Sequence, residues 1–326
     1  MNRPTRASHR SSFIVHRSSF VLLLLLACAP NEQSSRTDDL GRPVALTSTT
    51  TRVVSLAPNI TEMLFAIGAG DRVVGTDDFS NFPIEAKRIP KVGGMQPNVE
   101  KIAALKPDLV IASTEGNHPN LAAALSAAKI PLYVVRTDRL DEIAPAMERL
   151  GKLLDAPRAG DAVRELRDAI AAQRRTRAKH LRVLFAVWTD PLYVAGRNTF
   201  TDDLLQLTGA QNAVQVGGWP QYSLESLVAS PPELILYPRG AVTPQHVEAL
   251  MKRVPDLRAE VVAVDEDIFQ RPGPRVAIAA KALNAILDQE SRVIPSRARN
   301  PWPTQREAYL RRGSLAALGM TRQGRR

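Results

Sequence analysis

The sequence is poor in the side chains that bind metals or form covalent intermediates. It has one cysteine, Cys28, among 326 residues, so it predicts no disulfide and no catalytic cysteine. Beyond residue 27 it has three histidines, His118, His180 and His246. A receptor for a free metal ion needs several converging ligands, so we expect no metal site and no cofactor.

Motifs of enzyme chemistry are also missing. There is no nucleophile elbow, no glycine-rich phosphate loop and no HExxH string. An enzyme would have to use Glu100 and Glu225 as an acid/base pair, or Ser55 as a nucleophile, without any of these motifs. The sequence therefore predicts a protein that is not an enzyme and has no catalytic residues.

A basic surface is lacking in the central part of the chain, although the formal net charge is +10. Residues 1–27 hold four arginines and no acid, and residues 292–326 hold nine arginines and one glutamate. Removing these contributions of +4 and +8 leaves residues 28–291 with a net charge of −2. The sequence therefore predicts no nucleic-acid partner.

The first 27 residues are typical of an export signal. A basic stretch precedes the apolar run FVLLLLL at 20–26, which is too short to span a bilayer. The string LLAC at 25–28 resembles the bacterial lipobox, in which the cysteine becomes the lipid-modified first residue of the mature protein. We expect Cys28 to be the lipid anchor; the alternative is a plain signal peptide in which Cys28 is incidental.

Strands and helices alternate after this leader. Apolar strands are predicted at 53–56, 72–75, 109–112 and 131–135, separated by helices that include 61–67 and one starting after Asn98. A further strand at 183–187 restarts the same order. This alternation predicts an α/β protein with parallel sheets.

One stretch repeats at an offset of 125 residues. NVEKIAALKPDLVI at 98–111 aligns without a gap to SLESLVASPPELIL at 223–236, with a capping residue, an acid, an apolar helix face, a proline and an apolar strand in common. We interpret this as two Rossmann-like lobes of one topology, with a ligand cleft between them at the carboxyl ends of the strands. The alternative is that any capped helix entering a parallel strand shows these signals.

The expected domain boundaries follow from these patterns. We assign 1–27 to the signal peptide, 28–43 to a lipid-anchored tether, 44–156 to the N-terminal lobe and 157–179 to a long connecting helix. Residues 180–291 form the C-terminal lobe and 292–326 a basic, disordered tail. A helix with about 1.5 Å rise per residue is a stiff spacer, so we expect modest lobe closure in a monomer.

Four passages together resemble the periplasmic receptors of cobalamin and iron-siderophore ABC importers, most closely the cobalamin receptors. They are RVVSLAPNITE at 52–62, VGG at 92–94, PNVE at 97–100 and LKPDLVI at 105–111. The resemblance implies capture of a cobalamin-type corrinoid outside the cytoplasm and its delivery to a membrane permease with its ATPase. A haem or ferric-siderophore receptor is one alternative, and a lipoprotein enzyme or protein-binding scaffold is another.

The resemblance also implies roles for individual residues. Glu100 and Glu225 match the acids that dock onto permease arginines; the alternative is that each complements a helix dipole. Trp219, in the string GGWPQY, matches a ligand-facing tryptophan, with a buried packing role as the alternative. Phe79 and Tyr193 match further aromatic positions of the ligand site.

The loop DEDIFQRPGPR at 265–275 carries two more such positions. Asp267 and Arg271 match ligand contacts of the family; the alternative is an ion pair with each other that has structural value only. Two tryptophans that cobalamin receptors offer from the first lobe fall at Gly94 and Ser113. Half of the aromatic clamp is therefore missing, and a cobamide variant, a haem or a siderophore is an alternative ligand.

Overall fold

A computed structural model describes residues 35–46, 50–114 and 119–293. The predicted signal peptide, the Cys28 anchor, His118 and residues 294–326 of the basic tail lie outside these ranges. Within them, no helix combines the length and the apolar character that crossing a bilayer requires.

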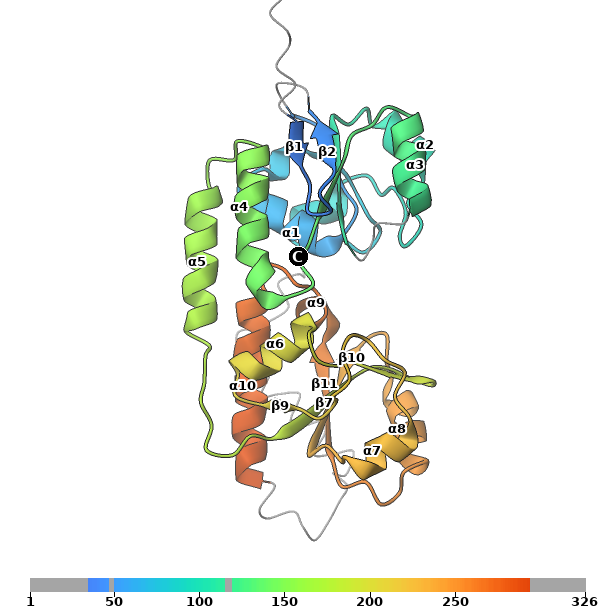
Figure 1. Ribbon diagram of the computed structural model, residues 1–326, viewed down its shortest axis with the longest axis vertical. Helices are drawn as coiled ribbons and strands as arrows, with labels where there is room; N and C mark the ends of the chain where they lie inside the picture. The colour runs from blue at the N-terminus through green and yellow to red at the C-terminus, as the bar shows by residue number, and fades with distance from the viewer. Residues whose placement is uncertain (1–34, 47–49, 115–118, 294–326) are drawn as a thin grey trace, which may run out of the picture. The chain divides into compact units, whose positions relative to one another are not determined.

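The N-lobe, the upper of the two lobes in Figure 1, is built on a parallel sheet whose strand order is β4-β3-β5-β6. Its strands are β3 (Val53–Ser55), β4 (Val73–Thr76), β5 (Leu109–Ser113) and β6 (Leu132–Val135). Its helices are α1 (Pro58–Ala66), α2 (Val99–Ala104), α3 (Pro119–Ala127) and α4 (Ile143–Leu153), with short turns η1 (Gly70–Arg72), η2 (Ile84–Arg88) and η3 (Leu140–Glu142).

The C-lobe repeats this plan. Its sheet has the order β11-β10-β7-β8, and β9 also pairs with β7. The strands are β7 (Arg182–Thr189), β8 (Leu192–Val194), β9 (Gln211–Asn212), β10 (Leu234–Arg239) and β11 (Glu260–Asp265), of which only β8 runs antiparallel. The helices are α6 (Phe200–Leu207), α7 (Leu224–Ala229), α8 (Pro244–Lys252), α9 (Glu266–Phe269) and α10 (Val276–Val293).

The repeated stretch has the same structure in both lobes, which confirms two α/β lobes with parallel sheets. Asn98 and Ser223 each cap their helix by accepting the backbone N–H three residues later. Asp108 accepts the backbone N–H of Arg52 at 2.9 Å, and Glu233 accepts that of Arg182 at 3.1 Å. Each acid thus ties the start of its own strand to the start of the neighbouring central strand.

Residues 35–46 belong to the N-lobe, whereas the sequence had assigned residues up to 43 to the tether. The strands β1 (Ser35–Thr37) and β2 (Pro43–Ala45) form an antiparallel hairpin. The Asp39 N–H donates to the Val134 carbonyl at 3.0 Å, and the Asp39 carboxylate accepts the Arg136 N–H at 2.7 Å and pairs with Arg149 at 2.7 Å. These bonds hold the hairpin against β6, at the edge of the sheet.

The connecting helix is shorter than predicted. Helix α5 spans Ala159–Ala171, and the chain then runs to β7 without helical structure. Donors of this stretch bond to backbone carbonyls of the C-lobe. The Arg175 N–H donates to the Leu207 carbonyl at 3.0 Å, and the Arg177 guanidinium donates to the Thr208 carbonyl at 2.8 Å. These tertiary bonds override the helix propensity of the arginine-rich sequence.

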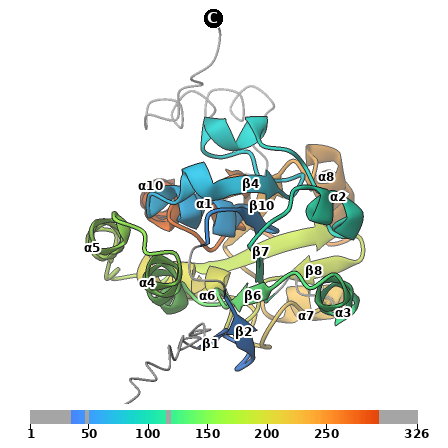
Figure 2. The ribbon, with the colours of Figure 1, turned by 90° about the horizontal axis from the view of Figure 1, so that it is seen from above.

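One continuous cluster of buried apolar residues joins the two lobes. It covers one face of the N-lobe sheet, including Val53 and Leu109, and one face of the C-lobe sheet, including Val183 and Phe185. Helices α1, α4, α5, α6 and α10 contribute to it, and Figures 1 and 2 place α4 and α5 on the side away from α2. The opposite face of each sheet has its own smaller cluster. A shared core of this kind resists large movements between the lobes.

Candidate functional site

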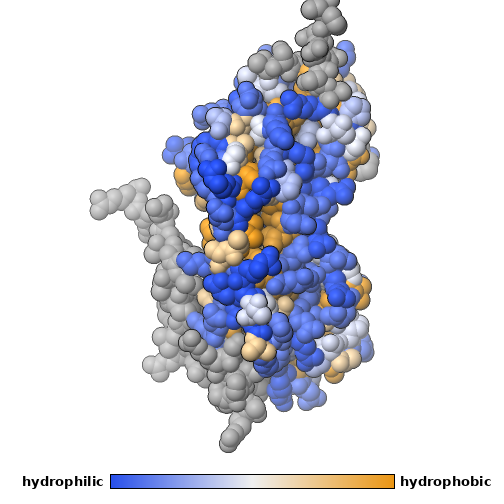
Figure 3. All heavy atoms as spheres, turned by 60° about the vertical axis from the view of Figure 1, so that its left-hand side comes forward, coloured by the Kyte–Doolittle hydropathy of each residue, from blue (hydrophilic) through white to orange (hydrophobic). Residues whose placement is uncertain are grey.

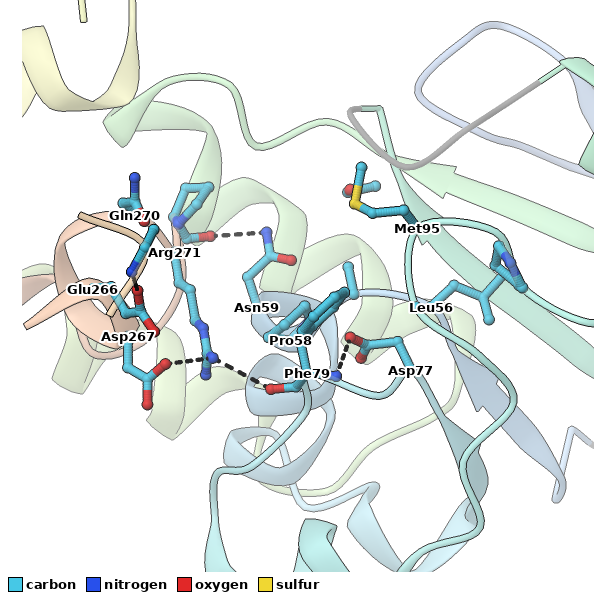
Figure 4. Close-up of a pocket in the computed structure, with 16 residues that line it drawn as sticks. Leu56, Pro58, Asn59, Asp77, Phe79, Met95, Glu266, Asp267, Gln270 and Arg271 are labelled. Atoms are coloured by element: carbon cyan, nitrogen blue, oxygen red, sulfur yellow. Dashed lines mark hydrogen bonds and ion pairs between the residues drawn. The ribbon is translucent and has the colours of Figure 1, made fainter. Parts of the chain in front are cut away.

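A cavity of about 560 Å³ lies between the lobes, at the ends of their strands (Figure 4). The N-lobe provides its apolar wall, and the C-lobe provides a largely polar wall from α9 and the residues after it. The N-lobe residues are Leu56, Ala57, Pro58, Asn59, Asp77, Phe79, Gly94, Met95, Pro97 and Ser113; the C-lobe residues are Ala241, Glu266, Asp267, Gln270, Arg271 and Pro272.

Strand direction explains why these residues meet. Leu56 directly follows β3, Asp77 directly follows β4, and Ser113 ends β5. Glu266 directly follows β11 in the other lobe. Because carboxyl ends of parallel strands share one edge of a sheet, both lobes present these turns to the same cleft, as the sequence had predicted.

Phe79 projects from a short turn after β4. Its N–H donates to the Asp77 carboxylate at 2.9 Å, which fixes the turn, and its side chain remains 52% exposed. Beneath it, the Thr61 hydroxyl lies 2.8 Å from that of Ser55 and 2.7 Å from that of Ser80, which in turn bonds Asp77. This buried polar network holds the aromatic ring on the cavity wall.

The ring of Phe79 occupies the space beside Gly94. A Cβ atom at position 94 would lie 3.0 Å from the Phe79 ring, so a larger side chain there would have to displace it. The neighbouring Met95 is 68% exposed and also lines the cavity. Phe79 and Met95 thus form an apolar surface beside Gly94, the position at which cobalamin receptors carry a tryptophan according to the resemblance.

Arg271 reaches from the C-lobe to the N-lobe. Its guanidinium pairs with Asp267 at 2.5 Å, so the ion pair that the sequence left as an alternative is present. It also donates to the Asn81 side chain at 2.7 Å and to the Phe79 carbonyl at 3.2 Å. Arg271 and Asp267 therefore lie on the cavity wall and at the same time hold the Phe79 turn.

A second ion pair joins the lobes through two residues outside the cavity lining, Glu62 and Arg275. Arg275 donates two hydrogen bonds to Glu62, at 2.9 and 2.6 Å, and its guanidinium carbon lies 4.3 Å from the centre of the Phe82 ring. The Glu62 side chain is 2% exposed. The Asn59 side chain adds a bond to the Pro272 carbonyl at 3.2 Å. Together with the contacts of Arg271, these bonds hold the two lobes together beside the cavity.

Burial changes the protonation of the acid beneath Phe79. Burial raises the pKa of Asp77 above its ordinary value, although hydrogen bonds from Ser80 and the Phe79 N–H and the charges of Lys91 and Arg271 oppose this. Burial likewise lowers the pKa of Lys91, which donates to the Ser80 carbonyl at 2.6 Å. Asp77 is therefore easier to protonate than an exposed aspartate.

Tyr193 and Trp219 lie elsewhere on the C-lobe. They are 38% and 46% exposed, respectively, and neither is among the residues lining the cavity. Tyr193 pairs with Gln221 through a β-bridge, which brings the Trp219 loop beside β8. Trp219 is thus not a buried packing residue, and both aromatic rings stay available to a ligand larger than the cavity.

Glu100 and Glu225 occupy equivalent positions in the first turns of α2 and α7. Both are exposed, and each lies two residues after the residue that caps its helix. Figures 1 and 2 place both helices on the side away from α5. Hydrogen bonds from its own N–H and from Ser223 lower the pKa of Glu225, so it is charged at neutral pH.

Sequence reasoning missed several polar residues of the site, among them Asp77, Asn81, Glu62 and Arg275. Asp77 had a usable signal, because it follows a predicted strand at its carboxyl end. No local sequence signal could have identified Arg271 and Arg275 as partners of Glu62, since they lie about 210 residues away in the chain. Within the described residues, no group of three or more His, Cys, Asp or Glu side chains is arranged to hold a metal ion.

The surface between the lobes is apolar on the side that carries α4 and α5. Figure 3 shows apolar side chains gathered between the two lobes and bordered by hydrophilic ones on both sides.

Comparisons with known proteins agree with this arrangement. Residues 53–266 match the family model described as periplasmic binding protein. The chain is 32% identical over 259 residues to a vitamin B12-binding protein of Pectobacterium atrosepticum, covering 76% of this chain and 92% of that protein. It is 30% identical over 277 residues to a vitamin B12-binding protein of Yersinia pseudotuberculosis, covering 83% and 92%.

Solved structures show the same architecture. The apo periplasmic heme-binding protein RhuT from Roseiflexus has a TM-score of 0.66 and 26% identity, covering 74% of this chain and 99% of that one. The periplasmic vitamin B12-binding protein BtuF of Vibrio cholerae has a TM-score of 0.58 and 27% identity, covering 74% and 98%. The chain therefore belongs to the periplasmic binding protein family.

Proposed function

We propose that this protein captures a cobalamin-type corrinoid outside the cytoplasm and delivers it to the permease of an ABC importer. One observation carries the proposal. Five of the seven positions that the resemblance to cobalamin receptors assigns to the ligand site line one cavity between the lobes, and Tyr193 and Trp219 do not; the five are Phe79, Gly94, Ser113, Asp267 and Arg271. The vitamin B12-binding relatives support the same ligand.

The two cavity walls suit different parts of such a ligand. The N-lobe wall, with Phe79, Met95, Leu56 and Pro58, offers an apolar surface for the face of a large ring. The C-lobe wall offers carboxylate and amide groups for polar substituents. Tyr193 and Trp219, outside the cavity lining, are exposed aromatic side chains of the C-lobe that a ligand larger than the cavity would contact.

A haem or ferric-siderophore receptor is the second candidate. Two heme-binding structures support it, because their TM-scores of 0.66 and 0.63 exceed the 0.58 of the vitamin B12-binding structure. The vitamin B12-binding relatives, at 32% and 30% identity over most of this chain, favour a corrinoid.

We infer a binding role and no catalysis. Ser55, the nucleophile that an enzyme would recruit, is fully buried and donates its hydroxyl to the Ala57 carbonyl at 3.2 Å. Glu100 and Glu225 lie on different lobes and are exposed, so they do not form an acid/base pair around a substrate. A scaffold that binds only other proteins would have no use for a cavity at the strand ends.

The delivery step involves the membrane partners. We propose that Glu100 and Glu225 dock onto arginines of the permease, which works with its ATPase, and that the protein acts as a monomer held by lipid on Cys28. The two exposed acids at equivalent helix starts give one attachment point on each lobe. Reversing both charges should abolish cobalamin import by cells and leave cobalamin binding unchanged.

Calorimetric titration of the full chain with cyanocobalamin, hemin and a ferric siderophore tests the ligand. We expect saturable one-to-one binding of cyanocobalamin, weakened about tenfold by Phe79→Ala and also by Trp219→Ala, since each removes a large apolar contact. The matched control is Ile278→Ala on α10, which is 46% exposed and outside the cavity. Binding of hemin alone, or of none of the three, would overturn the corrinoid assignment.

A further inference from the structure

The charges on the cavity wall are unbalanced. Three carboxylates line it, from Asp77, Glu266 and Asp267. Among the described lining residues, Arg271 is the one basic side chain. These three acids lie in the same cavity as the apolar N-lobe wall. They therefore determine which polar substituents of a ligand the cavity accepts.

Arg271 is already occupied by protein partners. It pairs with Asp267 at 2.5 Å, donates to Asn81 at 2.7 Å and to the Phe79 carbonyl at 3.2 Å, and lies 3.5 Å from Glu62. Its side chain is 14% exposed. A ligand carboxylate could bind this guanidinium only by breaking contacts that join the two lobes.

Glu266 is held on the wall with its charge uncompensated by any ion pair within the described residues. Its carboxylate accepts the Ala241 N–H at 3.0 Å. It packs on Gly240, where φ is +128° and a Cβ atom would lie 2.5 Å from the carboxylate. This glycine leaves room for the acid and fixes its position, so Glu266 presents a negative charge to the cavity.

Asp77 and Gln270 complete the polar lining. Asp77 accepts bonds from Ser80 and the Phe79 N–H, and Lys91 lies behind it, bonded to Thr76 at 2.8 Å. In either protonation state Asp77 offers no positive charge. The Gln270 amide has no hydrogen-bond partner among the described residues, so it is available to donate to and accept from a ligand.

We propose that these side chains make the cavity selective for large ring ligands whose edges carry uncharged primary amides, and that they disfavour ligands whose edges carry carboxylates. Ligand amide N–H groups donate to the carboxylate of Glu266, whereas a ligand carboxylate meets the like charges of Glu266 and the buried Asp77 in a partly desolvated site. The inference rests on the proposed function and narrows it: cobalamin carries amides around its ring, and haem carries two propionates.

The test compares two corrinoids that differ at one substituent. Cyanocobalamin and its monocarboxylate derivatives, in which one ring amide is hydrolysed, are titrated into the full chain at neutral pH and low ionic strength. We expect cyanocobalamin to bind at least about tenfold more tightly than a monocarboxylate whose hydrolysed group faces the acids. Added salt should reduce this ratio, because it screens charge.

Isosteric variants then assign the effect to named residues. Glu266→Gln keeps an oxygen for the Ala241 N–H, and Asp77→Asn keeps one for the Phe79 N–H. Together they should reduce the ratio to within about threefold, since both like charges are removed. Glu248→Gln removes an exposed acid of α8 outside the cavity lining, so it is the control and should leave the ratio unchanged.

The outcomes separate this inference from the proposed function. If cyanocobalamin binds but every monocarboxylate binds equally well, selection by charge is refuted and the cobalamin-binding role stands. If hemin binds more tightly than cyanocobalamin, both are refuted. If the double variant does not fold, the ratio measured on the unmodified chain still decides.

Discussion

The ion pair between Glu62 and Arg275 should account for a large part of the stability of the contact between the lobes. Glu62 lies on α1 of the N-lobe and Arg275 just before α10 of the C-lobe. The substitution Glu62→Gln removes the negative charge and keeps the shape of the side chain. It leaves the guanidinium groups of Arg275 and Arg271 without this partner in a buried site.

The expected loss follows from the contacts. Removing one member of a buried ion pair costs about 3–5 kcal/mol, and hydrogen bonds to charged groups contribute about 1.5–3 kcal/mol each. Glutamine retains one acceptor oxygen, and the two arginine side chains are 16% and 14% exposed, so water compensates in part. We therefore expect the free energy of unfolding to fall by about 2–3 kcal/mol. The Tm should fall by about 5–10 °C.

The assay is urea unfolding of the full chain, followed by far-ultraviolet circular dichroism. The matched control is Glu248→Gln, which removes an acid from an exposed pair with Lys252 on α8, where both side chains are more than 60% exposed. The control should change the free energy of unfolding by less than about 0.5 kcal/mol. The double variant Glu62→Leu with Arg275→Met should be more stable than Glu62→Gln, because it leaves no uncompensated charge at either position.

The reasoning fails if Glu62→Gln loses less than about 1 kcal/mol, or no more than the exposed control. It also fails if the double variant is less stable than Glu62→Gln.

Two further predictions concern the internal repeat and a constrained glycine. Although burial raises the pKa values of Asp108 and Glu233, hydrogen bonds from neighbouring groups lower both below their ordinary values. The stabilisation that these two carboxylates provide is therefore present above the unfolded-state pKa of about 4 and is lost as pH falls through the lower folded-state pKa. Urea titrations should show that Asp108→Asn and Glu233→Gln each lower the free energy of unfolding at neutral pH, and that this loss becomes smaller in acid. A loss that stays constant with pH would contradict the argument. Gly240→Ala should cost about 1–3 kcal/mol, because φ is +128° and the new Cβ would meet Glu266. Gly160→Ala, in α5 with open space around it, should instead stabilise by about 0.4–1 kcal/mol, and equal effects of the two substitutions would refute the argument.

Local sequence signals predicted most elements of the fold. The caps at Asn98 and Ser223, the apolar strands that follow them and the repeat at an offset of 125 residues predicted two α/β lobes, which the structure confirms. Such signals act within a few residues, since a cap, a strand pattern or a proline stop depends on neighbours along the chain. The end of α5 at Ala171 did not follow from them, because carbonyls of the C-lobe decide it.

Some residues of the site could be predicted from the sequence, whereas the contacts between them could be seen only in the tertiary structure. The resemblance was enough to expect Phe79, Asp267 and Arg271 near a ligand, and strand order was enough to expect a cleft at the carboxyl ends. That Arg271 holds the Phe79 turn, and that Arg275 pairs with Glu62, follows only from the packing of the lobes, because the partners lie 192 and 213 residues apart. Periodicity and capping determine local elements; contacts between distant side chains are determined by how the shared core brings the two sheets together.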